Sequence, residues 1–466
     1  MKFYGFPDGF EWGGAVSALQ AEGQPEGRLE VSYDRLHQMH PERFYDGVGP
    51  HTTSDLMNNF KKDVQLMRSL GMNSTRTSIA WSRLMLNERD VNPEAVKYYN
   101  DYFDELLKNN IQPMVCLFHI DMPMMMEDKG GWESREVVEH FVHFAKQCFS
   151  IFGHKIKRWL VHNEPTVTVW AKYLGQYDYP CVKDEKRAIQ AGFNIAYSHA
   201  RVIEAYRQMD LDGKIGIVSN LLPGIPADSS NPEDVSATNF YDAWHNYAFI
   251  DAAVLGKFPE YLVQLVKEEG GLPTYEEADL DVIARNTVDF IGINYYYPVR
   301  TKAIVDGVPH PDCGKLYPFN VYSEYRDPNA VYNESRGWEV YPKALFDVAE
   351  VIKERYNNIE WFVSENGMGV ENEEKYLDIN GKVMDDYRID FFREHLMWLN
   401  KAIANGANCM GYHCWSWIDN WSPINAYKNR YGLVRVDRNN NFVRSIKHSG
   451  DWFREVTIKN GFYWYK

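Results

Sequence analysis

The feature of this sequence that most limits its fold is the regular alternation of two kinds of segment. Short apolar runs rich in β-branched or aromatic residues end in polar residues, and stretches with apolar residues at helical spacing lie between them. One helical stripe is formed by Leu56, Phe60, Val64, Met67 and Leu70. The predicted strands are Phe10–Ala18, Ser74–Trp81, Pro113–His119, Arg158–Asn163, Lys214–Asn220, Val288–Tyr295, Trp361–Ser364 and Asn408–Trp415. The predicted helices are Asp55–Leu70, Glu94–Lys108, Ser134–Phe152, Asp184–Met209, Tyr341–Tyr356 and Asp386–Ala404.

This alternation predicts an α/β fold with parallel strands and right-handed crossovers. Eight strand-like runs favour a closed (β/α)₈ barrel of the TIM type over an open doubly wound sheet. A dinucleotide-binding sheet would carry G-x-G-x-x-G after its first strand, and neither that motif nor a P-loop occurs. We therefore expect residues 1–466 to form a single barrel domain. Its long loops at the carboxyl-terminal face are predicted to be Leu221–Asp289 and Thr301–Gly337.

Composition and charge exclude several classes of partner. The chain has 50 Lys and Arg against 65 Asp and Glu, a net charge of −15 that disfavours binding to nucleic acid or to an anionic membrane. Neither a signal-peptide-like stretch nor a membrane-length apolar run is present, and the six cysteines form no C-x-x-C pair. We expect a cytoplasmic protein with no nucleic-acid or membrane partner; the sequence leaves its oligomeric state open.

Polar and aromatic side chains follow nearly every predicted strand. In a barrel of this type the carboxyl ends of the strands form the active site. Arg76 lies within the second run, and the residues at or just after the ends of the others are Gln20, His119, Asn163, Glu164, Asn294, Tyr296, Glu365 and Trp415.

Two of these residues, Glu164 and Glu365, indicate which reaction the site could catalyse. Glycoside hydrolysis needs one carboxyl to protonate the leaving oxygen and a second to attack the anomeric carbon or to activate water. Arg76 is a candidate to keep the nucleophile ionised, and the Tyr296 hydroxyl could hold its oxygen in place. Each glutamate alone could instead form a salt bridge or bind Mg²⁺ or Zn²⁺. The sequence has no clear His/Asp metal cluster, which disfavours a metal-dependent hydrolase, and both glutamates are present, which disfavours a non-catalytic sugar-binding barrel.

Ordered motifs along nearly the whole chain resemble glycoside hydrolase family 1. They begin with Phe10-Glu11-Trp12-Gly13-Gly14-Ala15 and end with Arg430-Tyr431-Gly432-Leu433. Between them stand 76–83 (RTSIAWSR), 119–123 (HIDMP), 130–132 (GGW), 163–165 (NEP), 294–296 (NYY), 337–338 (GW), 365–367 (ENG) and 415–417 (WSW).

The resemblance implies a (β/α)₈ barrel that hydrolyses β-glycosides with retention through a covalent glycosyl-enzyme, and that needs no metal or organic cofactor. It implies Glu164 as general acid/base and Glu365 as nucleophile, steadied by Arg76 and Tyr296. Sugar-hydroxyl ligands implied by the family are Gln20, His119, Asn163 and Trp415, and we also expect Asn294 to contact substrate. Trp338 matches a wall of the aglycone subsite.

One segment bears on the substrate. Family members for neutral sugars have Glu-Trp where this chain has Ser422-Pro423. A glutamate there would repel a 6-phosphate, whereas a small serine makes room and donates a hydrogen bond. The 6-phosphoglycosidases resemble this chain in that serine and in a later tyrosine, here Tyr431. We therefore expect a 6-phospho-β-glucosidase, with a β-glycosidase for neutral or otherwise 6-substituted sugars as the alternative.

Several departures from the family pattern leave questions open. The 6-phosphoglycosidases carry a lysine at the position of Asn429, and Lys428 could replace it after a one-residue loop shift. Pro423 leaves the choice between gluco and galacto substrates open, and the aglycone is also open. The segment Gly27–Asp34 lacks the usual glycine-rich stretch, and Ile120 stands where an aromatic residue is usual.

Overall fold

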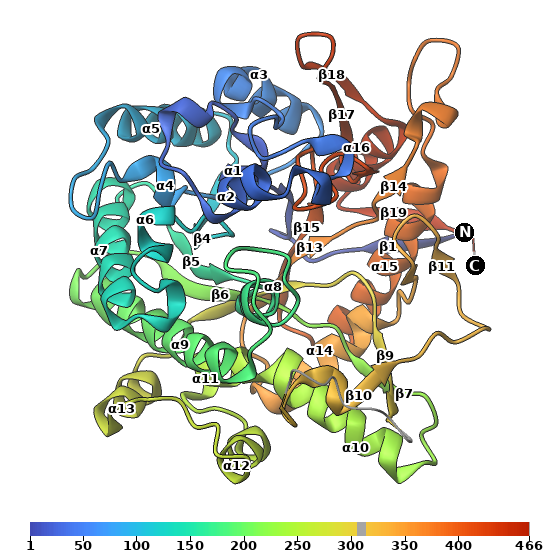
Figure 1. Cartoon of the computed structure of the whole chain (residues 1–466). Helices are drawn as coiled ribbons and strands as arrows, with labels where there is room; N and C mark the ends of the chain where they lie inside the picture. The colour runs from blue at the N-terminus through green and yellow to red at the C-terminus, as the bar shows by residue number, and fades with distance from the viewer. Residues whose placement is uncertain (305–313, 466) are drawn as a thin grey trace.

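The computed structural model describes residues 1–304 and 314–465, and a closed parallel barrel lies at its centre (Figure 1). The order of strands around the barrel is β13-β15-β2-β3-β4-β5-β6-β8. Their bounds are β2 Glu11–Ala15, β3 Ser74–Ser78, β4 Gln112–Phe118, β5 Arg158–Asn163, β6 Lys214–Asn220, β8 Phe290–Asn294, β13 Trp361–Asn366 and β15 Cys409–Trp415. Each of the eight predicted runs overlaps one of these strands, and β13 continues two residues past its predicted end to include Glu365, so the predicted fold is confirmed.

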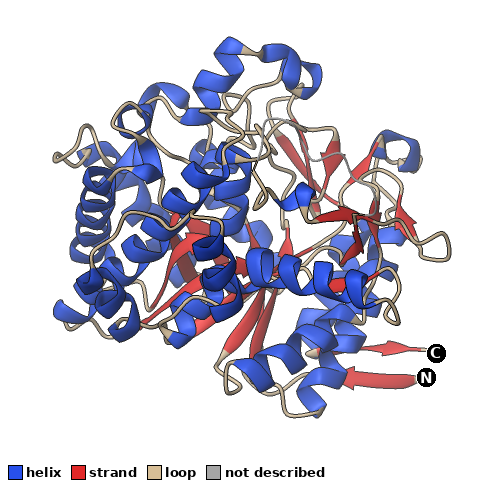
Figure 2. Cartoon of the chain, turned by 60° about the horizontal axis from the view of Figure 1, so that its bottom comes forward, coloured by secondary structure: helices blue, strands red, loops and turns tan. Residues whose placement is uncertain are grey.

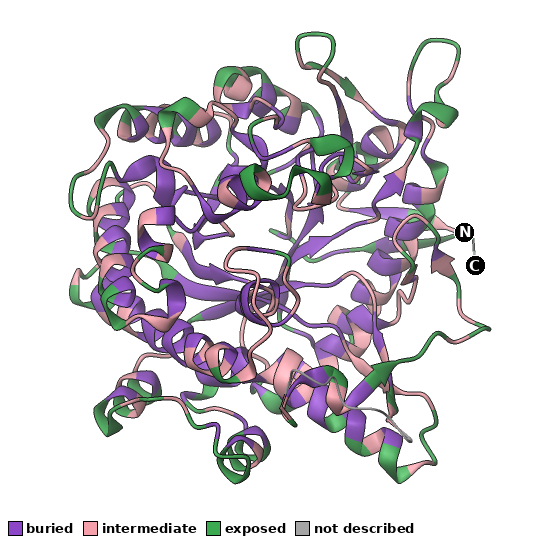
Figure 3. Ribbon diagram, in the orientation of Figure 1, coloured by how far each residue is buried: buried purple, intermediate pink, exposed green. Residues whose placement is uncertain are grey.

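The barrel strands are buried (Figure 3), and the side chains of β4 alternate between two layers of core. In β4, Met114 and Cys116 point into the barrel and pack with Leu160 and Phe362, whereas Val115 belongs to the core shared with the helices. This is the two-residue period expected of a strand whose faces are both buried. The barrel interior is therefore packed with side chains, and a ligand can enter only at an end.

Helices surround the barrel, and all six predicted helices are present. They are α3 Leu56–Ser69, α5 Pro93–Lys108, α7 Arg135–Phe152, α9 Glu185–Gln208, α14 Ala344–Arg355 and α15 Asp386–Ala404. Side-chain caps mark the starts of α5 and α9: the Asn92 side chain accepts a hydrogen bond from the Glu94 amide, and that of Asp184 accepts from the amides of Lys186 and Arg187. No helix among residues 1–304 and 314–465 combines the length and apolar character that a membrane span requires.

The two predicted long loops contain secondary structure. The first part of Leu221–Asp289 runs along the barrel mouth, where β7 (Gly224–Pro226) pairs with β9 (Val299–Ala303). Its later helices α11 (Ala248–Leu255) and α13 (Glu277–Arg285) pack against α9, so only the start of this segment is a mouth loop. In Thr301–Gly337, β9 pairs with β10 (Tyr322–Glu324), and residues 305–313 lie outside the described residues.

Smaller elements complete the fold. The chain ends meet where β1 (Lys2–Gly5) pairs with β19 (Gly461–Trp464), as Figure 2 shows. The short helices are α1 Ala18–Ala21, α2 Ser32–Met39, α4 Trp81–Leu84, α6 Met124–Glu127, α8 Pro165–Tyr173, α10 Pro232–Tyr241, α12 Glu260–Glu268 and α16 His448–Lys459. The short strands are β11 Tyr332–Asn333, β12 Trp338–Glu339, β14 Val370–Glu371, β16 Asn429–Arg430, β17 Val434–Asp437 and β18 Val443–Ile446.

A buried ionic cluster supports the loops that follow β13 and β15. Arg388 on α15 pairs with Asp385 and with Glu373, and Lys447 also contacts Glu373 at 2.5 Å. Burial alone would raise the pKa of Glu373, but the two cations hold it well below its usual range. Arg388 Nη2 also donates to the carbonyl of Arg430 at 2.9 Å. The cluster therefore connects α15 with the segments that follow β13 and β15.

Replacing Arg388 with methionine should destabilise the protein by about 3–5 kcal/mol, because buried Asp385 loses its ion-pair partner and buried Glu373 loses one of its two cations. The matched control is Arg393→Met on the same helix, where an exposed pair with Asp390 is broken at a cost of under about 1 kcal/mol. Urea unfolding measures both, and equal losses would contradict the structural role given to this cluster.

Candidate active site

A cavity of about 470 Å³ opens at the carboxyl ends of the barrel strands. Nine of the residues predicted from the sequence line it: Gln20, His119, Glu164, Tyr296, Trp338, Glu365, Trp415, Ser422 and Tyr431. Arg76, Asn163 and Asn294 lie directly behind this lining, in contact with it. Side chains from seven different chain segments therefore converge on one cavity only because the barrel closes.

Glu365, in β13, is buried against a cation. Its carboxylate forms an ion pair with Arg76 of β3 and accepts a hydrogen bond from the Tyr296 hydroxyl. Arg76 is fully buried, and burial lowers its pKa to about 10, so it stays charged at neutral pH. An adjacent guanidinium favours the ionised form of a carboxyl group. Glu365 is thus held as a carboxylate.

Glu164, which follows β5, has a different environment. Loss of hydration raises the pKa of its carboxyl, while a hydrogen bond from Asn294 Nδ2 at 2.8 Å and the more distant charge of Arg76 oppose that rise. Its backbone has a φ of 47°, in the left-handed region that non-glycine residues rarely adopt. The chain turns at this residue from β5 into α8, which Figure 1 shows in front of the barrel. Glu164 is thus biased towards its protonated form.

The end of β8 holds both carboxyl groups at once. Asn294 donates to Glu164, and Tyr296, two residues later, donates to Glu365. Asn294 also donates to Asn163 Oδ1 at 3.2 Å, and Asn163 lies 3.3 Å from the ring of His119. Burial and the charge of Arg76 hold the pKa of His119 well below its usual range, so its imidazole is neutral.

Aromatic rings form two walls of the cavity. His119 and Trp415 stack with ring centroids 6.1 Å apart, and Trp338 stacks on Tyr297 at 4.7 Å. Flat apolar faces next to amide, imidazole and hydroxyl groups suit a sugar ring, which offers both C–H faces and hydroxyl edges.

The segment after β15 completes the cavity on a third side. Ser422 and Tyr431 line it, as do Ile424 and Asn425. Lys428 does not line it: its ammonium lies 3.6 Å from the carboxylate of Glu371. Asn429 is buried and donates to the Ser335 carbonyl at 3.3 Å. The one-residue shift that would bring Lys428 into the site is absent, because β16 pairs in register with β14.

Comparison with known proteins decides the family. The sequence matches the family description "Glycosyl hydrolase family 1" over residues 3–462. It is 47% identical to the 6-phospho-beta-glucosidase GmuD of Bacillus subtilis over 98% of this chain and 99% of that protein. The chain belongs to glycosyl hydrolase family 1. It is also 34% identical to a 6-phospho-beta-galactosidase of Clostridium acetobutylicum, with 97% of each chain covered. Among solved structures, the family 1 β-glucosidase from Thermotoga maritima superposes with a TM-score of 0.90 at 30% identity, covering 99% of this chain and 100% of that one.

Sequence reasoning missed part of the cavity wall of this family 1 enzyme. Tyr33, Trp170, Tyr177, Asn220, Leu222, Tyr297, Arg336 and Asn425 line the cavity and were not singled out. Asn220 ends a predicted strand, so its position alone could have identified it. Arg336 precedes the Gly337-Trp338 motif by one residue, but nothing in its spacing indicates that it faces the cavity.

The unusual Ile120 has a structural consequence. Ile120 and Ile424 both line the cavity, with φ values of 62° in each case. Positive φ is strained for β-branched side chains, and such strain concentrates at ligand sites. Both isoleucines pack beside the cluster that includes Tyr33, from the segment that lacks the usual glycines. The two departures noted in the sequence thus meet at one apolar side of the cavity.

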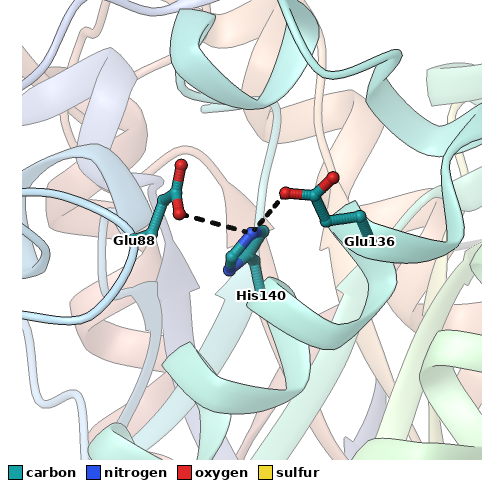
Figure 4. Close-up of side chains that lie close together, drawn as sticks. All are labelled: Glu88, Glu136 and His140. Carbon is teal, nitrogen blue, oxygen red and sulfur yellow. Dashed lines mark hydrogen bonds and ion pairs between the residues drawn. The ribbon is translucent and has the colours of Figure 1, made fainter.

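A different group of side chains resembles a metal site. Glu88, Glu136 and His140 gather on the outer side of α7, as Figure 4 shows, and form the one such group within residues 1–304 and 314–465. Lys129 already contacts both glutamates, at 3.0 and 2.5 Å. None of the three lines the cavity, so the group is a surface ion-pair network separate from the active site.

Proposed function

We propose that this family 1 enzyme is a retaining β-glycosidase in which Glu365 is the nucleophile and Glu164 the general acid/base. The observation that carries the assignment is the contrast between the two carboxyl groups of one cavity. Glu365 pairs with Arg76, whereas Glu164 has a raised pKa and an amide as its hydrogen-bond partner. Such a difference separates the acid from the nucleophile in glycosidases. The proposal takes residues 1–466 as one catalytic domain.

The mechanism has two displacements. Glu365 attacks the anomeric carbon while Glu164 gives its proton to the leaving oxygen, which forms a covalent glycosyl-enzyme and releases the aglycone. Glu164, now ionised, then takes a proton from water, which attacks the same carbon and frees Glu365 with the β configuration retained. Gln20, His119, Asn163, Asn294 and Trp415 would bind the sugar hydroxyls, and Trp338 would face the aglycone. No step requires a metal or cofactor.

The favoured substrate is a 6-phosphorylated β-glucoside. Two observations support it: the relative at 47% identity is named a 6-phospho-beta-glucosidase, and Ser422 rather than a glutamate lines the cavity. A carboxylate at that position would repel the phosphate dianion. Such a substrate would be met in the cytoplasm, where sugars are phosphorylated. Neutral or otherwise 6-substituted β-glycosides are the alternative, because Asn429 removes the expected lysine.

Substitution of each glutamate should have a distinct effect. Glu365→Ala should abolish turnover of every substrate. Glu164→Ala should lower kcat/KM about 10²–10⁴-fold for glycosides with poor leaving groups, but much less for a dinitrophenyl glycoside that needs no proton. Steady-state kinetics with both aglycones test this, and wild-type rates in Glu365→Ala would contradict the assignment.

The pH profile should depend on Asn294. Its amide stabilises the ionised form of Glu164, so Asn294→Ala should raise the pKa of Glu164 further. A carboxyl that keeps its proton to higher pH moves the alkaline limb of kcat/KM upwards. Asn220→Ala is the control, because Asn220 lines the cavity but contacts His245. An unmoved or lowered alkaline limb in Asn294→Ala would count against Glu164 as the acid.

Substrate preference can be measured with p-nitrophenyl β-glucoside and its 6-phosphate. We expect kcat/KM to be higher for the phosphorylated compound by at least two powers of ten, since charge-assisted hydrogen bonds to the phosphate add to binding. Higher kcat/KM for the neutral glucoside would instead favour the alternative substrate class.

A further inference from the structure

We propose that Arg336 supplies the positive charge that binds the substrate phosphate, in place of the lysine absent at position 429. This inference rests on the proposed 6-phosphoglucosidase activity and names the residue that makes it selective. A chain with a net charge of −15 repels a phosphate dianion from a distance, so binding requires a cation within the cavity.

Arg336 is the one Lys or Arg among the cavity-lining residues of the described ranges 1–304 and 314–465. Its guanidinium stacks on the ring of Trp338, with Cζ 4.1 Å from the ring centroid. Its Nε is buried and makes no hydrogen bond, and within the described part of the chain no carboxylate pairs with it. A partly buried guanidinium with an unused Nε donor at a cavity wall is suited to an anionic group.

Asn429, which stands where the 6-phosphoglycosidases carry a lysine, is in direct contact with the segment that carries Arg336. Asn429 donates to the carbonyl of Ser335, the residue before Arg336. The Ser335 hydroxyl in turn accepts from the amide of Glu371, which pairs with Asn429 between β14 and β16. The short side chain of Asn429 thus anchors this segment, and the cation is provided by the neighbouring residue.

Tyr431 connects Arg336 with the rest of the predicted phosphate site. The Tyr431 ring packs so closely on Gly369 that a Cβ there would lie 2.3 Å from it, and the Gly369 carbonyl accepts from Asn333. Trp338, on which Arg336 stacks, packs against the apolar cluster that contains Tyr431. Burial raises the pKa of the Tyr431 hydroxyl, and the charge of Arg336 opposes that rise. Arg336, Tyr431 and Ser422 line the same cavity, where each offers a hydrogen-bond donor for the phosphate.

Other cations nearby are already engaged. Lys428 lies outside the cavity lining beside Glu371, and its Nζ is 5.9 Å from the Tyr45 ring centroid. Arg76 neutralises Glu365. Arg336 remains available without breaking any ion pair.

The test compares kcat/KM for p-nitrophenyl β-glucoside 6-phosphate with that for the neutral glucoside in wild type, Arg336→Gln and Arg326→Gln. Arg326 is a matched control, because it stacks on Tyr332 at 3.7 Å and pairs with exposed Glu334, outside the cavity lining. Arg336→Gln should lower the ratio of the two values by about 10- to 100-fold, the loss expected for charge-assisted hydrogen bonds. Arg326→Gln should leave the ratio unchanged.

Inhibition by glucose 6-phosphate provides a second readout that does not depend on the aglycone. Its Ki should rise in Arg336→Gln by a similar factor, and Asn429→Lys in that background should restore part of the loss. Thermal unfolding of each variant identifies a folding defect, which would lower both rates without changing their ratio.

The outcomes separate this inference from the proposed function. If the wild type prefers the phosphorylated substrate and Arg336→Gln keeps that preference, Arg336 is not the phosphate ligand. An equal loss on both substrates in a folded variant would assign Arg336 to the aglycone wall and overturn the inference as well. A wild type without any preference for the phosphate would overturn the substrate assignment, and this inference with it.

Discussion

The ion pair between Arg76 and Glu365 is the interaction on which the rest of the site depends. A fully buried arginine is tolerated because it also donates to the Val16 carbonyl and to Ser364 Oγ, both at 3.3 Å, and lies 3.0 Å from His119 Nδ1. Together with Glu365, these partners come from the ends of three barrel strands, β2, β4 and β13. A shift of β3 or β13 would separate Arg76 from Glu365 and leave both charges unpaired in the interior, so the register of these strands and the ionisation of Glu365 are linked.

The opposite bias on Glu164 follows from the same arrangement. Arg76 is engaged by Glu365, and the direct hydrogen-bond partner of Glu164 is the neutral amide of Asn294. Because Asn294 and Tyr296 leave β8 two residues apart, a single strand end sets both environments. This acidic protein also needs a positive charge inside its cavity to bind a phosphate. We propose that a loop residue, Arg336, supplies this charge, and its guanidinium is stacked on the ring of Trp338.

The sequence predicted the eight strands and the residues at their ends because hydrophobic periodicity and strand-end position depend on local order along the chain. It could not predict Arg336 as a cavity residue, since its placement depends on contacts between Ser335, Asn429 and Glu371, which are distant in sequence. The sequence also could not show that Lys428 stays outside the cavity, because the register of its loop is fixed by the pairing of β16 with β14. The prediction of a mouth loop over the whole of Leu221–Asp289 was wrong for the same reason. Only the packing of α11 and α13 on α9 shows where the later part of this segment lies.

In the proposed mechanism Glu365 forms a covalent bond to the sugar, while Glu164 donates a proton to the leaving group and then accepts one from water. The most direct measurement is mass spectrometry of the protein after incubation with a 2-deoxy-2-fluoro-β-glucosyl fluoride and its 6-phosphate, whose fluorine slows hydrolysis of the glycosyl-enzyme. We expect the mass of the protein to increase by one fluorosugar, located by peptide mapping on Glu365. A label on Glu164, or hydrolysis of the fluorosugar reagents without any covalent adduct on the protein, would contradict this mechanism.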